Sequence, residues 1–144
     1  MLKIALLEWC QYRFDHSNAG KCGRNCNNAA ACVQSCDECL NQVHWFPQYG
    51  GRSDYNCIKL LLKYVLRYTE KYSAQITSAL QYIDLSKYPQ YHIFSIGCGA
   101  APDLMAFEEI SSGKRIYYKG YDRNRLWARV CSHKQRYAII REWN

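Results

Sequence analysis

The clearest hydrophobic pattern in the chain lies between residues 53 and 83. Apolar side chains recur there at steps of three and four residues, and charged side chains occupy the opposite side. This spacing predicts one long amphipathic helix with a continuous buried stripe, capped at its start by Ser53 or Asp54. The stripe comprises Ile58, Leu61, Leu62, Val65, Leu66, Tyr72, Ile76, Ala79, Leu80 and Ile83. Pro89 predicts a break after it, because the residue before a proline avoids the helical conformation.

Short apolar runs replace the helical pattern after this break. Residues 93–96 predict a β-strand on which the long helix is expected to pack, and residues 115–121 predict a second strand. Between the strands, two glycines and Pro102 predict a tight turn and then a helix over residues 102–110 that starts with unpaired N–H groups. A further helix is expected from Asn124 to the C-terminus. The predicted fold class is α/β, with a partial Rossmann-like βαβ unit and a long packing helix.

The first third of the chain has a weaker apolar pattern. Residues 1–9 predict a short strand or helical turn, and residues 10–31 predict a loop rich in glycine and asparagine that an apolar core would not hold by itself. The predicted organisation is therefore a small Cys-rich helical and loop module over residues 1–52, followed by the long helix and a truncated βαβα unit over residues 53–144.

Nine cysteines add a chemical role to the N-terminal module. Residues 1–9 are too short for a secretory signal, so we expect a cytoplasmic protein whose clustered thiols bind metal more readily than they form disulfides. Three of the thiols recur at four- and three-residue steps on one predicted helical stripe, and a closed site needs a fourth ligand. The predicted structural zinc ligands are Cys32, Cys36, Cys39 and Cys57, with Cys10, Cys22, Cys26 and His44 as alternatives.

Two other interpretations of these cysteines stay open. Three thiols on one helix can pack as small apolar side chains without metal. The spacing of Cys32, Cys36 and Cys39 is also the one that radical S-adenosylmethionine enzymes use for a four-iron cluster, although a chain of 144 residues is too short for the barrel of that family.

The stretch from Phe94 to Gly99 resembles the first motif of class I S-adenosylmethionine-dependent methyltransferases. Gly97, Cys98 and Gly99 stand where that family turns beneath the methionine moiety of the cofactor, and Ala101 stands at the family's third glycine position. Asp122 follows Gly99 by 23 residues and matches the family's second motif, an acid that accepts hydrogen bonds from the ribose hydroxyls. The resemblance implies S-adenosylmethionine as cofactor. The alternative is an ordinary strand-to-helix turn.

The resemblance covers only the cofactor half of such an enzyme. It runs from about residue 91 to the end of the chain, and 22 residues follow Asp122, enough for one helix. A truncated or split methyltransferase is therefore predicted, which needs a second chain or a dimer mate to complete an acceptor site. The sequence nominates no general base, nucleophile or acceptor-binding residue.

The net charge of +7 is concentrated at the C-terminal end. Residues 111–144 hold nine Lys and Arg against two acidic residues, whereas residues 1–110 hold ten of each sign. This predicts an anionic partner, either nucleic acid or an acidic protein surface. No apolar run approaches the roughly 20 residues of a membrane helix, so no membrane partner is expected.

Two alternative functions follow from the charge and the cysteines. One is a non-catalytic small basic interaction protein, an inhibitor or adaptor of the kind that mobile genetic elements encode, which uses the zinc module and the basic C-terminal helix. The other is a zinc-stabilised nucleic-acid-binding module in which the glycine turn is only structural.

Overall fold

The computed structural model describes residues 2–16, 35–44, 55 and 57–131. Over these residues the chain forms α1 (Leu2–His16), α2 (Cys36–His44), α3 (Ile58–Leu80), the short 3-10 turn η2 (Leu85–Lys87), β1 (Gln90–Ile96), α4 (Pro102–Ile110), β2 (Arg115–Tyr121) and α5 (Trp127–Cys131). The predicted helix at residues 102–110 and the predicted strand at residues 115–121 are confirmed. The predicted boundary at residue 52 lies outside the described residues.

β1 and β2 form a parallel pair connected through α4. Their register runs from Gln90 opposite Arg115 to Ile96 opposite Tyr121. Parallel strands need such a crossover, because the chain must return to the same end of the sheet before the second strand can begin. The predicted α/β class and the βαβ unit are therefore confirmed, while the Rossmann-like character of this unit stays a prediction.

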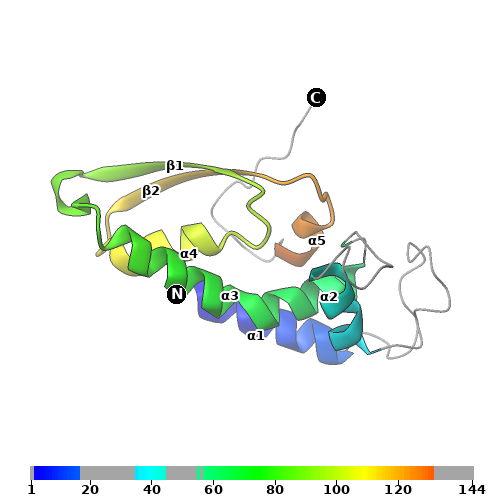
Figure 1. Cartoon of the computed structure of the whole chain (residues 1–144). Helices are drawn as coiled ribbons and strands as arrows, with labels where there is room; N and C mark the ends of the chain where they lie inside the picture. The colour runs from blue at the N-terminus through cyan, green and yellow to red at the C-terminus, as the bar shows by residue number, and fades with distance from the viewer. Residues whose placement is uncertain (1, 17–34, 45–54, 56, 132–144) are drawn as a thin grey trace.

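The described elements are arranged in layers, with the sheet on one side and helices on the other (Figure 1). α4 lies between the sheet and α3, and α1 packs along α3 and also contacts α4. Leu104 of α4 packs against Tyr118 of β2, while the next residue, Met105, joins the cluster around α3. The prediction that the long helix packs directly on the sheet is therefore wrong, since α4 occupies that position.

The N-terminal segment differs from its prediction as a short strand or turn followed by a loop. α1 is a helix of 15 residues that continues through His16. Leu6 and Cys10, one helical turn apart, are buried in the cluster that also holds the core of α3. Lys3 pairs with Glu109 of α4 at 3.0 Å, and the backbone N–H of Leu2 donates to Glu108 at 2.9 Å. These contacts with distant parts of the chain stabilise a helix that has little amphipathic pattern of its own.

α3 is shorter than predicted, and its buried stripe is interrupted. Its N-cap is Cys57, in extended conformation and without a side-chain cap, whereas Ser53 and Asp54 lie outside the described residues. Leu61 and Val65 are fully buried, but Ile83 lies beyond the helix and is 55% exposed. The buried residues of α3 thus lie between Leu60 and Ser73, and none lies in its last turns.

One apolar cluster joins the N-terminal helix to the last described helix. It consists of Leu6, Cys10, Leu61, Leu62, Val65, Ala100, Met105, Trp127, Val130 and Cys131. The predicted C-terminal helix is described only as α5, and its continuation lies outside the described residues. Among the described helices, none combines the length and the apolar content required to cross a bilayer.

The unequal burial along α3 predicts unequal effects of truncation. Leu61→Ala removes a side chain with no exposed area, and we expect it to lower the free energy of unfolding by about 2–5 kcal/mol. Ile83→Ala is the matched control and should change it by less than about 0.5 kcal/mol. Urea denaturation followed by circular dichroism measures both values. Equal losses in the two variants would contradict this assignment of the core.

Candidate functional site

The glycine turn, residues 97–101, follows β1 directly. Gly97 and Gly99 have φ angles of +69° and +51°, which glycine adopts without steric penalty. Ala101 has a φ of +56° and forms the N-cap of α4. For a residue other than glycine, the left-handed backbone conformation costs roughly 1–2 kcal/mol of conformational free energy. The chain therefore reverses at the end of β1 through three left-handed residues, the last of which starts the crossover helix.

Asp122 contacts this turn across the end of the sheet. Its Oδ2 accepts a hydrogen bond from the backbone N–H of Gly99 at 2.9 Å, and its Oδ1 accepts one from the N–H of Asn124 at 2.7 Å. The two strands run parallel and in register, so both end at the same edge of the sheet. The structure thus brings together Gly97, Cys98, Gly99, Ala101 and Asp122, the residues predicted to bind the cofactor.

The backbone donors of the turn are largely used inside the protein. The N–H groups of Gly97 and Cys98 both donate to the carbonyl of Tyr121, at 2.7 and 3.0 Å, and the N–H of Ala101 donates to the carbonyl of Cys98. In the first turn of α4, Pro102 has no N–H and the Asp103 carboxylate accepts from the N–H of Leu104. The expected row of unpaired N–H groups is therefore mostly absent among the described residues of this site.

Cys98 points away from solvent and packs on β2. A Cβ atom at Gly120 would lie 2.8 Å from its Sγ and 2.8 Å from Cε1 of Tyr118, so only glycine leaves room there. Burial, together with the negative charges of Asp122 and Asp103, raises the pKa of the Cys98 thiol to about 11. The thiol is neutral at physiological pH and has a packing role.

Two carboxylates give the site a negative character. Asp103, at the start of α4, accepts a hydrogen bond from the hydroxyl of Tyr118 at 2.9 Å, and Asp122 accepts one from the N–H of Gly99 in the turn. Both charges act on the same buried thiol, so both lie close to the turn. A cation is therefore favoured near this turn over an anion.

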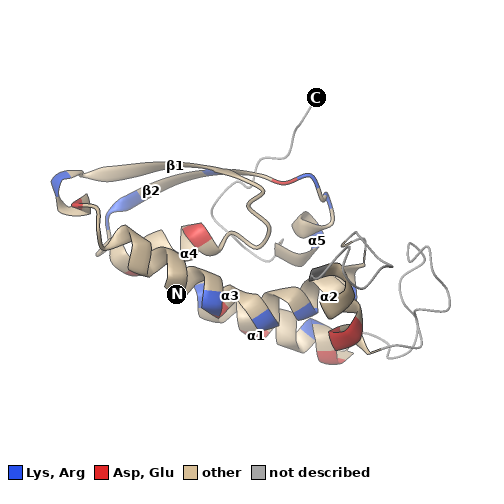
Figure 2. Ribbon diagram, viewed as in Figure 1, with Lys and Arg blue, Asp and Glu red and all other residues tan. Residues whose placement is uncertain are grey.

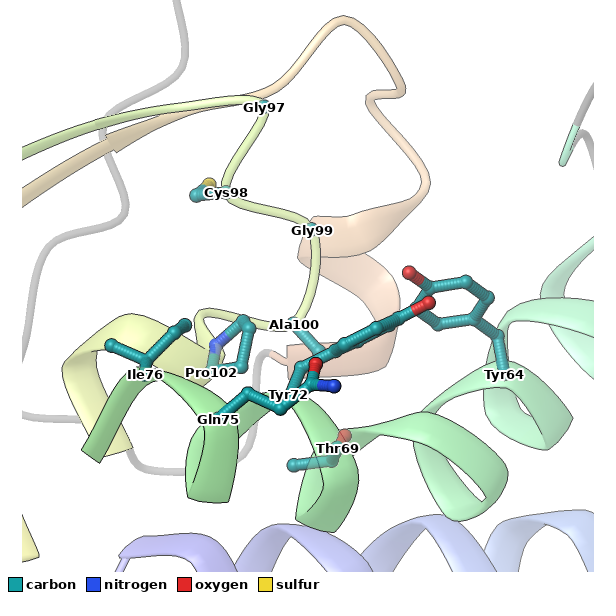
Figure 3. A pocket seen from close by; sticks show the side chains of 10 residues that line it. All are labelled: Tyr64, Thr69, Tyr72, Gln75, Ile76, Gly97, Cys98, Gly99, Ala100 and Pro102. Atoms are coloured by element: carbon teal, nitrogen blue, oxygen red, sulfur yellow. The ribbon is translucent and has the colours of Figure 1, made fainter. Parts of the chain in front are cut away.

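A pocket of about 270 Å³ lies between the glycine turn and α3 (Figure 3). It is lined by Tyr64, Thr69, Tyr72, Gln75, Ile76, Gly97, Cys98, Gly99, Ala100 and Pro102. The Thr69 hydroxyl is buried and has no hydrogen-bond partner in the described part of the chain. The sequence does not predict the α3 side of the pocket, because its pattern places Tyr72 and Ile76 in the core stripe and gives no role to Tyr64, Thr69 or Gln75.

Three of the predicted metal ligands, Cys36, Cys39 and Cys57, lie away from the glycine turn, at α2 and the start of α3. Cys36 begins α2, and Cys39 packs with Cys57 in an apolar cluster between α2 and α3. Burial raises the pKa of the Cys36 thiol, while the charge of Lys59 lowers it. Cys57 raises this pKa further, so the thiols of Cys36 and Cys57 are neighbours. Within residues 2–16, 35–44, 55 and 57–131, no group of three or more metal-binding side chains is assembled.

The other candidate ligands divide between the core and segments that are not described. Cys22, Cys26 and Cys32 lie outside the described residues, as does the side chain of His44. Cys10 is fully buried in the core cluster of α1, α3 and α5, and burial raises its pKa to about 12. It therefore belongs to the core and not to the cluster around Cys39 and Cys57.

No protein-family model, no curated protein and no solved structure matches the chain. The function must therefore be inferred from the geometry of the chain itself.

The close packing of Cys98 against β2 is testable by a double-mutant cycle. Gly120→Ala places a methyl group against Cys98 and Tyr118, and we expect it to destabilise the protein by about 1–3 kcal/mol. In a Cys98→Ala background the loss should be smaller, since one of the two closest contacts is gone. Thermal or urea unfolding of the four variants measures this coupling. Strictly additive losses would contradict the contact.

Proposed function

We propose that this chain binds S-adenosylmethionine at the glycine turn and forms the cofactor half of a class I methyltransferase. The observation that carries the proposal is the meeting of Gly99 with the Asp122 carboxylate at the end of two parallel strands. This edge of a parallel sheet is where ligands bind in open α/β folds. The pocket on the α3 side of the turn supplies the concave surface that a ligand requires.

The charges of the site favour this cofactor over a phosphate-bearing one. A phosphate is held by free N–H groups at a helix start, but here the turn amides are engaged and Asp103 occupies the first turn of α4. A dinucleotide would also bring its phosphates towards two carboxylates. S-adenosylmethionine has no phosphate, and it carries a positive sulfonium and a positive ammonium group. The carboxylates of Asp103 and Asp122 suit these charges from beside the turn, although neither lines the pocket itself.

The residues around the turn fit the remaining groups of the cofactor. Each oxygen of Asp122 accepts one backbone hydrogen bond, and a carboxylate has about four acceptor positions, so ribose hydroxyls can donate to those that remain. A side chain at Gly97 would meet open space, which leaves this position accessible. Across the pocket, the hydroxyl of Thr69 is buried and has no hydrogen-bond partner among the described residues.

The aromatic side chains of α3 complete the pocket wall. Tyr64 packs edge-on against Trp127 at a centroid distance of 5.6 Å, and its ring lies 6.4 Å from that of Tyr72. Burial raises the pKa of Tyr64, with Tyr72 adding to the effect, so its hydroxyl remains protonated. These rings offer an apolar surface with hydroxyl donors to the bound cofactor.

Catalysis requires a surface that the described residues do not provide. The pocket volume of about 270 Å³ lies just below the roughly 300–1,000 Å³ of complete ligand sites. When bound, S-adenosylmethionine supplies an electrophilic methyl group, and transfer depends on holding the acceptor in line with it. Here the chain's own residues bind and orient the cofactor, while a second chain or a dimer mate supplies the acceptor site.

We expect S-adenosylmethionine to bind with micromolar affinity and Asp122→Asn to weaken binding about tenfold or more. The amide retains one acceptor oxygen but loses the charge and half of the acceptor positions. Isothermal titration with S-adenosylmethionine and S-adenosylhomocysteine measures the affinities. Asp84→Asn is the matched control, because Asp84 is an exposed carboxylate before β1, at the opposite end of the sheet.

A melting curve of each variant separates lost binding from lost folding. Gly99→Asp offers a second variant, since it adds a side chain and a third negative charge at the turn. No heat of binding at millimolar ligand, in wild-type protein that melts cooperatively, would exclude this function.

We further propose a structural zinc ion bound by Cys36, Cys39 and Cys57, with Cys32 as the fourth ligand. In the described part of the chain the first three thiols do not form a metal-binding group, so the site closes only when the metal draws them together. Support comes from the proximity of Cys36 to Cys57 and from the shared cluster of Cys57 and Cys39. Four thiolates are a preferred closed ligand set for zinc. The remaining alternatives, a basic inhibitor or adaptor and a zinc-stabilised nucleic-acid module, depend largely on the basic C-terminal end and the Cys-rich segment, most of which lies outside the described residues.

Zinc analysis tests the metal proposal directly. The purified chain should contain about one zinc ion, and Cys57→Ser should reduce the zinc content and lower the melting temperature. Cys98→Ala is the control, since Cys98 belongs to a different cluster. Elemental analysis and a melting curve with and without chelator give the readouts. A folded chain without zinc, or equal zinc in Cys57→Ser, would rule out this site.

A further inference from the structure

The sheet has one face that no described element covers. We call it the outer sheet face, and it comprises Gln90, His92, Phe94, Ile96, Arg115, Tyr117, Lys119 and Tyr121. The alternate residues Tyr91 and Tyr118 point towards α4 and are buried. On the outer sheet face, Phe94 is 62% exposed and Ile96 is 69% exposed. Figure 1 shows the helices gathered on the opposite side of the sheet.

Aromatic rings lie side by side across the two strands of this face. His92 and Tyr117 are directly opposite in the register, and their rings are stacked with centroids 4.7 Å apart and an angle of 14° between planes. The rings of Phe94 and Tyr121 lie 5.0 Å apart. Tyr117, which is 43% exposed, and Phe94 therefore present ring surface at two positions along the strands, on which flat ligands can stack.

Positive charges accompany these rings. Arg115 lies beside Tyr117, with Nη1 3.3 Å from the phenolic oxygen, and the Nζ of Lys119 lies 5.5 Å from the centre of the Tyr121 ring. None of the eight residues that define the outer sheet face is acidic. Figure 2 shows further basic positions in the loop that follows β2.

We propose that the outer sheet face binds single-stranded nucleic acid. Bases stack on the rings of His92, Tyr117, Phe94 and Tyr121, and Arg115 and Lys119 meet the phosphates. A protein partner that covered this face with an apolar helix would remove the charges of Arg115 and Lys119 from water. No acidic residue on the face would compensate for the cost of this desolvation. The observed charges therefore favour a polyanion with flat bases over a protein partner.

The dimensions of the face agree with this ligand. The two strands are paired over seven residues, and strands rise about 3.3 Å per residue, which gives a platform roughly 20 Å long. Sheets that bind RNA in this manner stack two or three bases. This inference does not depend on the cofactor site, because the pocket lies on the α3 side of the glycine turn.

Fluorescence anisotropy with a labelled octanucleotide, tested as RNA and as DNA, provides the measurement. We expect Phe94→Ala to weaken binding about tenfold or more, since one base loses its stacking surface. Tyr82→Ala is the matched control, because Tyr82 is 93% exposed but lies outside the sheet. Phe94 is itself mostly exposed, so its truncation should leave the melting temperature nearly unchanged.

The salt dependence of binding tests the charged residues separately. Lys119→Gln should reduce the slope of log affinity against log salt by about 0.7, the value for one lost phosphate contact on a single strand. Lys71→Gln, an exposed lysine of α3, should leave the slope unchanged. Equal affinities in Phe94→Ala and Tyr82→Ala would overturn the proposal. Failure of the wild type to bind either octanucleotide at low salt would also overturn it and would leave the face to a protein partner.

Discussion

The parallel pairing of β1 with β2 is the constraint on which the rest of this structure depends. Two parallel strands must end at the same edge, and the chain between them must cross back along the sheet. The edge brings the glycine turn beside Asp122, although the two are separated by 23 residues in the sequence. The crossover places α4 against one face of the sheet, and no described element covers the other. Both candidate ligand surfaces thus have the same origin.

α4 connects the sheet to the helical layer because it is buried on two sides. Leu104 faces Tyr118 of the sheet, and Met105 faces the cluster built around α3. A helix of nine residues can do this because successive residues point in directions about 100° apart. The same helix begins at the glycine turn, so the packing of the core also fixes the position of the turn relative to α3. The pocket between them depends on that packing.

The two candidate surfaces carry opposite charge. Asp103 and Asp122 lie at the glycine turn, whereas Arg115 and Lys119 lie on the outer sheet face. Residues 119 and 122 are close in the sequence but belong to different surfaces, because Lys119 points outward from the strand and Asp122 folds back onto Gly99. A cationic cofactor and an anionic polymer can therefore be attracted to separate parts of one small domain.

The local sequence was sufficient to predict the elements with strong local signals. The glycines, Pro102 and the apolar run at residues 115–121 each restrict the backbone directly, so the turn, α4 and β2 agree with their predicted positions. The ends of α3 were less predictable, because Cys57 caps the helix without any side-chain hydrogen bond. The length of α1 was not predictable from its pattern, since contacts with α3 and α4 stabilise that helix.

The sequence by itself determined the βαβ unit and the juxtaposition of the glycine turn with Asp122, because backbone preferences and parallel topology act over short distances along the chain. Only the tertiary structure decided that Tyr64 and Tyr72 line the pocket, that Gly120 makes room for Cys98 and that Phe94 and Tyr121 share an open face. Each of these three features depends on which side of a helix or strand another helix or strand covers. That is decided by packing between segments that are distant in the sequence.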